Sequence, residues 1–89
     1  MMNMKNETNA EAVALAALNW TFGDDRRAER FLALTGMTPD DIRTRLAQPD
    51  FLAAALRFLE SYEPDLLACA DSLELSPSIL VEARRALER

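Results

Sequence analysis

Hydrophobic residues recur every three or four positions along most of the chain, the spacing of one face of an α-helix. No segment of useful length alternates apolar and polar residues as a β-strand requires, and β-branched residues are scarce. The helical pattern runs almost without a break from residue 9, whereas residues 1–8 are polar and aperiodic. The sequence therefore predicts an all-α protein with a disordered N-terminal tail at residues 1–8 and a single helical domain at residues 9–89.

Prolines and glycines divide this domain into helices. Proline suits the first helical position because its missing N–H would have no partner there, and all four prolines follow a residue that can open a helix. Gly23 and Gly36 are expected helix ends, and Asp24 is an expected N-cap. The sequence thus predicts a compact bundle of about six short helices, at residues 10–22, 25–35, 39–47, 49–61, 64–73 and 77–87.

The helices predicted at residues 10–22 and 49–61 are apolar on most faces, which favours packing on each other at the centre. Alternatively, one of them presents its surplus apolar face to a partner, above all to a second copy in a homodimer. Large aromatic residues near helix ends commonly anchor interfaces, although filling the core is their commoner role. A groove between these two helices that accepts a partner helix is therefore a candidate interface, lined by Trp20, Phe22, Phe58 and Tyr62.

Two hairpins can be tested against the needs of a DNA-reading helix-turn-helix. In the hairpin at residues 31–46, the carboxylates of Asp40 and Asp41 would face DNA phosphates and hydrogen-bond acceptors on the bases. Their negative charge therefore argues against DNA binding by this hairpin. In residues 66–87, Ala70 is small at the helix crossing, although Glu74 stands where a turn glycine is usual. The helix at residues 77–87 is the alternative DNA-contacting element, and its candidate contacts are Arg84, Arg85 and Arg89. These arginines also suit the negative end of the helix dipole, so a helix-turn-helix shape without DNA binding is favoured.

The two hairpins also resemble each other. Shifting the chain by 38 residues pairs Met37-Thr38-Pro39 with Leu75-Ser76-Pro77. The match is short and consists mostly of capping residues, and it suggests a duplicated helical hairpin.

Charge and composition narrow the possible partners and locations. Fifteen acidic against ten basic residues give a net charge of −5, which disfavours binding to nucleic acid and to anionic lipid. The apolar run at residues 12–18 is far shorter than the about 18 residues of a spanning helix, and Glu7 and Glu11 replace the basic flank of a signal peptide. A lone cysteine excludes an internal disulfide, so the cytoplasm is the expected compartment.

No residue pattern indicates catalysis. The chain has no histidine, the commonest proton shuttle and zinc ligand. Cys69 shares the apolar side of its helix with Leu66 and Leu73, which predicts a buried, inert thiol. The acidic pairs at residues 24–25 and 40–41 each open a helix and lack the spacing of a calcium loop. We therefore expect no catalytic residue, no cofactor and no metal site.

Four stretches carry a family resemblance: "ALNWTF" (residues 17–22), "RFLALTGM" (30–37), "LAQPDFLAAALRFL" (46–59) and "LLACADSLELSPS" (66–78). With them, residues 11–87 resemble a family of short bacterial proteins known only as a domain of unknown function. The resemblance implies a single complete domain and no activity. The expected function is a non-enzymatic, cytoplasmic protein-interaction module that binds a protein partner, including a second copy of itself. The alternative is a transcription-associated, helix-turn-helix-like protein that contacts DNA through residues 77–87.

Overall fold

Six helices build the chain in the computed structural model, which describes the backbone of residues 2–89 and the side chains of residues 9–89. They are α1 (Met2–Thr21), α2 (Asp25–Thr35), α3 (Pro39–Arg45), α4 (Pro49–Glu60), α5 (Glu63–Ser72) and α6 (Pro77–Leu87). The described residues contain no strand, so the all-α prediction is confirmed. The radius of gyration of 12.3 Å is that of a compact helical bundle.

The capping chemistry explains why the boundaries were predictable. Helices α2 and α6 match their predicted ranges, and α3, α4 and α5 differ by one or two residues at an end. Asp24 caps α2 by accepting a hydrogen bond from the Arg27 backbone N–H, and a proline occupies the first turn of α3, α4, α5 and α6. Helix α1 begins at Met2, ahead of its predicted start. The tail predicted at residues 1–8 falls outside the part of the chain with described side chains, and its disorder stays a prediction.

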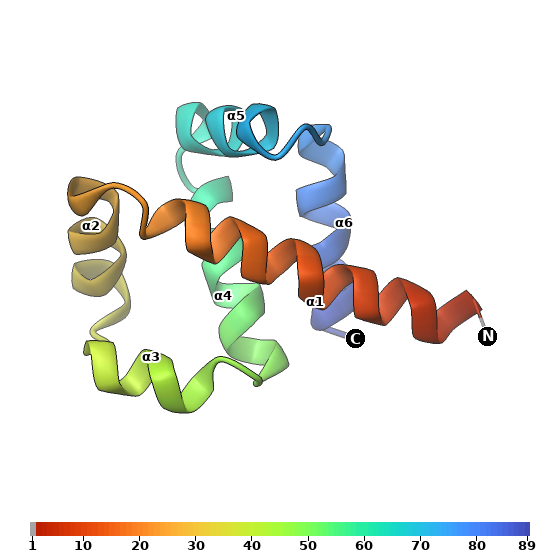
Figure 1. The fold of residues 1–89 in the computed structure, drawn as a ribbon, viewed down its shortest axis with the longest axis horizontal. Coiled ribbons are helices and arrows are strands. Elements are labelled where there is room, and N and C mark those ends of the chain that lie inside the picture. Colours follow the sequence, from red (N-terminus) through yellow and green to blue (C-terminus); the bar gives the residue numbers. More distant parts are fainter. Residues whose placement is uncertain (1) are drawn as a thin grey trace.

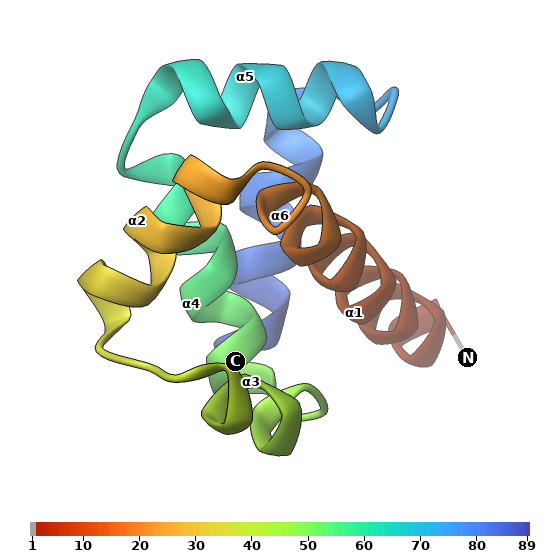
Figure 2. The ribbon, with the colours of Figure 1, turned by 60° about the vertical axis from the view of Figure 1, so that its left-hand side comes forward.

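Helix α4 lies in the middle of the bundle, where α1, α5 and α6 all pack against it (Figures 1 and 2). Helix α1 crosses both α4 and α6, and α5 lies across the ends of α4 and α6 (Figure 1). The predicted packing between the two apolar helices is therefore confirmed. Helix α4 buries most of its length, and its buried residues are Phe51, Leu52, Ala53, Ala55, Leu56, Phe58 and Leu59.

Phe31 holds α2 onto the rest of the bundle. It is the only buried residue of α2 and is 0% exposed. Its ring meets the rings of Phe22, Phe51 and Phe58 edge to face, with centroid distances of 5.6, 6.2 and 5.2 Å. This geometry places ring edges against ring faces, the favourable arrangement of aromatic quadrupoles. One side chain of α2 thus contacts α4 and the end of α1.

The two predicted hairpins repeat in their turns. Among the residues with a described backbone, only Gly36 and Glu74 have a positive φ, at 72° and 58°, and they are 38 positions apart. The Glu74 N–H donates to the Asp71 carbonyl (3.1 Å) and the Leu75 N–H to the Ala70 carbonyl (2.9 Å). These two bonds form a Schellman motif, which normally places glycine where Glu74 stands.

The packing of the hairpins does not repeat. Helix α3 buries no residue, whereas α6 buries Leu80 and Ala83. Thr38 and Asp41 form a full capping box at the start of α3, but the Ser76 side chain makes no capping hydrogen bond at the start of α6. The sequence echo therefore reports a left-handed residue at the same place in each hairpin, and not two equivalent structural units. Even the turns differ, because the Gly36 N–H donates to the Leu32 carbonyl in a single αL cap.

Replacing Glu74 by glycine is expected to stabilise the protein. A Cβ in the left-handed region is sterically disfavoured, and glycine removes that penalty at a smaller entropic cost in the unfolded chain, for a net gain of about 0.5–1 kcal/mol. Gly36→Ala is the reciprocal variant, because an added Cβ would meet nothing within 4 Å and only the positive φ opposes it. Urea denaturation followed by circular dichroism should show opposite shifts for the two variants. Destabilisation by Glu74→Gly would contradict this explanation of the turn.

Candidate interaction site

The aromatic residues predicted to line one groove lie in three different environments. Phe22 and Phe58 both pack against Phe31, and Phe58 is only 7% exposed. The space expected to receive a partner helix beside these two rings is thus filled by Phe31 of the same chain. Phe58 belongs to the buried core, and Phe22 packs against the edge of that core.

Trp20 is half-buried beneath Arg27. The guanidinium carbon of Arg27 lies 3.6 Å from the centroid of a Trp20 ring, and an Arg27 Nη donates to the Trp20 carbonyl oxygen at 2.6 Å. Arg27 therefore contacts the end of α1 rather than extending into solvent. Its long side chain lies back along α1, because a cation over an indole face and a hydrogen bond to a helix-end carbonyl both favour this position.

Tyr62 is the most exposed of the four rings, at 53%. The Arg30 guanidinium lies 5.5 Å from the Tyr62 ring centroid and 5.3 Å from that of Phe58, and it forms an ion pair with Asp65. Arg30 therefore covers the approach from Phe58 to Tyr62. The four rings do not form one open groove, and an interface role for them stays a prediction.

The three candidate DNA contacts on α6 also separate. Arg84 points back to α4, with Nε donating to Glu60 (2.6 Å) and Nη1 to Glu88 (2.7 Å). Arg85 is on the outer surface, 3.9 Å from Glu82, and Arg89 is exposed. Arg84 thus helps to fix α6 to α4, which leaves two of the three arginines on the outside. Contact with DNA stays a prediction.

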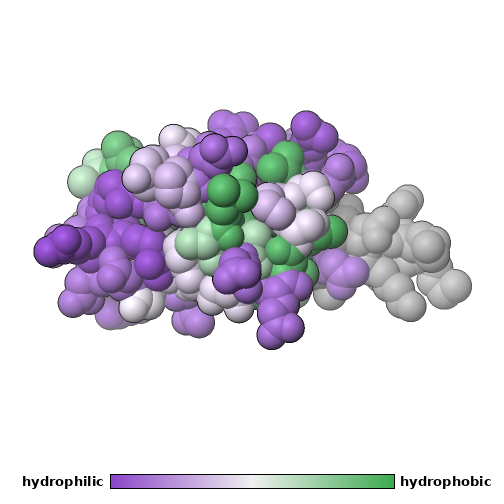
Figure 3. All heavy atoms as spheres, turned by 90° about the horizontal axis from the view of Figure 1, so that it is seen from above, coloured by the Kyte–Doolittle hydropathy of each residue, from purple (hydrophilic) through white to green (hydrophobic). Residues whose placement is uncertain are grey.

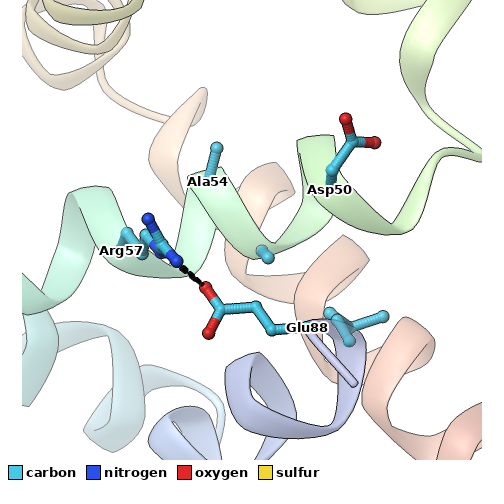
Figure 4. A pocket seen from close by; sticks show the side chains of 6 residues that line it. Asp50, Ala54, Arg57 and Glu88 are labelled. Atoms are coloured by element: carbon cyan, nitrogen blue, oxygen red, sulfur yellow. Dashed lines mark hydrogen bonds and ion pairs between the residues drawn. The ribbon is translucent and has the colours of Figure 1, made fainter.

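A shallow depression of about 500 Å³ lies between α4 and the end of α6 (Figure 4). Figure 4 shows Arg57 and Glu88 pointing toward each other across it, and the two form an ion pair. Loss of hydration alone would raise the pKa of Glu88, but hydrogen bonds from Arg57 and Arg84 hold it below its usual value. Arg57 and Glu88 bind each other here, and Asp50 adds a further carboxylate to the lining.

A second groove lies between α1 and α6, and the sequence did not predict it. It has a volume of about 540 Å³. Its lining is Asn9, Ala10, Ala12, Val13, Leu75, Ile79, Glu82, Ala83, Ala86 and Arg89. Figure 3 shows hydrophobic side chains among hydrophilic ones on the face of the molecule seen from above. Ile79 remains 41% exposed in the groove.

A signal for this groove was present in the sequence. Ile79 and Ala86 lie on one flank of α6, beside the buried face that holds Leu80 and Ala83, and Leu75 precedes the helix in the turn. This flank makes the apolar stripe of α6 wider than one packing contact requires. The stripe alone could not show which helix packs over it, or what fraction of it stays exposed to solvent.

Burial keeps the Cys69 thiol away from solvent. Cys69 is fully buried, as predicted, and burial raises the pKa of its thiol to about 11. Within residues 9–89, no group of His, Cys, Asp and Glu side chains is arranged to hold a metal ion. None of the helices, over the same described part of the chain, has the length and apolar character needed to cross a bilayer.

The fold and its surface define a small all-α bundle with one apolar groove at the crossing of two helices. Residues 7–89 match the family described as "Protein of unknown function (DUF3572)", and the chain belongs to that family. The predicted resemblance to a family of unknown function is thus confirmed. Neither a curated protein nor a solved structure matches the chain.

The Glu88 ion pairs predict acid sensitivity. Because the folded pKa of Glu88 lies below its ordinary value of 4.5, its stabilising contribution is fully present above pH 4.5 and is lost as pH falls through the folded pKa. We expect the free energy of unfolding of Glu88→Gln to fall less than that of the unchanged protein between about pH 6 and about pH 3. Urea denaturation at fixed salt measures this difference. Glu29→Gln, on the exposed side of α2, is the matched control, and an equal pH dependence in all three proteins would refute the role of Glu88.

Proposed function

We propose that this protein is a non-enzymatic interaction module that binds a helix of a protein partner in the α1–α6 groove. One observation carries the proposal: an apolar groove lies open at the surface, with Ile79 41% exposed inside it. Amphipathic helices bind such grooves by placing apolar residues against the lining at helical spacing. The groove is a better candidate than the four aromatic residues, because Phe31, Arg27 and Arg30 already contact those rings.

The mixed composition of the lining supports a protein interface. Val13, Leu75 and Ile79 provide apolar contacts, while Asn9, Glu82 and Arg89 add polar groups. A hydrophobic centre with a polar rim is typical of protein interfaces. Covering the exposed part of Ile79 would contribute about 1 kcal/mol through the hydrophobic effect. The alanines at positions 83 and 86 leave room for a partner helix to approach closely.

The chemistry of the buried groups supports a binding role rather than catalysis. The Cys69 thiol stays protonated at neutral pH, because its pKa is raised to about 11, and a protonated thiol is a poor nucleophile. The arginines nearest to the depression between α4 and α6 are already bound to carboxylates. A lone cysteine also suits the reducing cytoplasm, where we place this protein.

DNA binding through α6 is the less favoured function. Its support is limited to the outward position of Arg85 and Arg89. Arg84 is held by Glu60 and Glu88, and Glu82 shares the outer side of the helix with Arg85. Each such carboxylate reduces the attraction of α6 for phosphate.

Photo-crosslinking tests the proposal directly. A photoreactive phenylalanine analogue is placed at position 79 in the full chain, and the matched control carries it at position 34 on α2. Leu34 is 68% exposed but lies outside the groove. After irradiation in the native cells, position 79 is expected to give discrete protein adducts that position 34 does not give. Equal adducts at both positions, adducts to DNA, or none at position 79 would contradict the proposed function.

A further inference from the structure

Helices α2 and α3 are attached to the rest of the bundle by few side chains. With the turn between them they form residues 25–45, which we call the α2–α3 lid, and Figure 1 shows this lid at the edge of the bundle. Phe31 is the only buried residue of the lid, because α3 buries none. Within residues 9–89, every other buried residue lies in α1, α4, α5 or α6. The buried core therefore holds the lid by a single ring.

The other contacts of the lid are peripheral. Three partly buried side chains lie against the edge of the core, and they are Leu32, Met37 and Ile42. Arg27 donates to the Trp20 carbonyl oxygen, and Arg30 forms an ion pair with Asp65. The Arg30 side chain is 42% exposed, so solvent weakens this ion pair. These contacts guide the lid into place but add little buried area to that of Phe31.

Both connections of the lid suit a hinge. Residues 23–24 connect it to α1, residues 46–48 connect it to α4, and all five residues are exposed. Hinges are short connections whose backbone angles can change without disturbing packed side chains. Helix α3 has only seven residues, and a helix of that length is not stable without packing partners. We therefore expect α3 to lose its position whenever α2 leaves the bundle.

We propose that the α2–α3 lid opens as one unit while α1, α4, α5 and α6 stay packed. Opening withdraws Phe31 from the three phenylalanine rings around it and lifts Arg27 from Trp20. An aromatic surface that is covered in the closed protein then becomes accessible to solvent. The inference goes beyond the proposed function and does not depend on it, because no residue of the lid lines the α1–α6 groove.

The distribution of buried side chains makes this opening easier than complete unfolding. Segments with few buried apolar contacts open locally at a lower free energy than the whole domain. Opening breaks the edge-to-face contacts of Phe31, but the packing of α4 with α1, α5 and α6 is kept. Complete unfolding must break both sets of contacts.

Amide hydrogen exchange of the full chain, followed residue by residue by NMR, tests the inference. When closing is fast, the exchange rate of a protected amide is proportional to the equilibrium constant for opening. In the unchanged protein, the most protected amides of α2 and α3 should share one opening constant. This constant should exceed that of the most protected amides of α4 by about tenfold or more.

Three variants separate opening of the lid from complete unfolding. Phe31→Leu should speed exchange in both α2 and α3 about tenfold, because the edge-to-face contacts exist only in the closed lid. Asp65→Asn removes the ion pair with Arg30 from the α5 side, and it should speed the same amides about twofold to fivefold.

Leu80→Val is the matched control. Leu80 is fully buried in α6, and its side chain stays packed when only the lid opens. This variant should speed exchange of the most protected α4 amides about threefold or more, because complete unfolding becomes easier. Exchange in α2 and α3 should stay unchanged. Circular dichroism verifies that each variant keeps its helices, and Asp65→Asn keeps the test decisive if Phe31→Leu does not fold.

Two results would overturn the lid. If Leu80→Val speeds exchange in α2 and α3 as much as in α4, the bundle opens only as a whole. If Phe31→Leu or Asp65→Asn speeds exchange in α2 but not in α3, the two helices open separately and do not form one unit.

Discussion

The placement of Phe31 determines which surfaces of this bundle are closed and which stay open. Its edge-to-face contacts with Phe22, Phe51 and Phe58 fix α2 against α4 and the end of α1. Helix α2 then carries Arg27 over Trp20 and Arg30 toward Tyr62. The side of α1 that faces α2 is therefore occupied by the protein's own residues. The part of α1 nearer its N-terminus contributes residues 9, 10, 12 and 13 to the apolar groove, which lies where α1 crosses α6.

The helix boundaries could be predicted from local sequence, whereas the contacts between helices depend on tertiary packing and could not. The boundaries could be predicted because each boundary signal depends only on a residue and its neighbours in the sequence. These signals are the proline at the start of four helices, the Asp24 cap and the Gly36 turn. The left-handed Glu74 could not be recognised by type, because this conformation is normally marked by glycine. The prediction of a groove between α1 and α4 did not include Phe31, since helical spacing does not reveal that this ring of α2 packs against Phe22 and Phe58. Exposure of Ile79 depends on how far α1 covers α6, which only the assembled bundle shows.

The arginines of α6 show how position on a helix decides the role of one residue type. Arg84 is only 20% exposed and binds Glu60 and Glu88, so it serves the α4–α6 contact. Arg85 and Arg89 lie on the outer side together with Glu82, at the edge of the groove. Sequence reasoning grouped the three as one basic cluster. In the fold, Arg84 links α6 to α4, whereas Arg85 and Arg89 lie with Glu82 at the edge of the groove. An edge that carries both signs of charge suits a protein partner better than a phosphate backbone.

The central claim is that the free binding surface lies at the α1–α6 crossing and not at the aromatic residues of α1 and α4. Amide chemical shifts of the isotope-labelled full chain, recorded without and with the partner that crosslinks at position 79, test it most directly because they report every residue at once. We predict that the changes concentrate in residues 9–16 and 78–89. Changes centred on Trp20 and Tyr62 would contradict the claim.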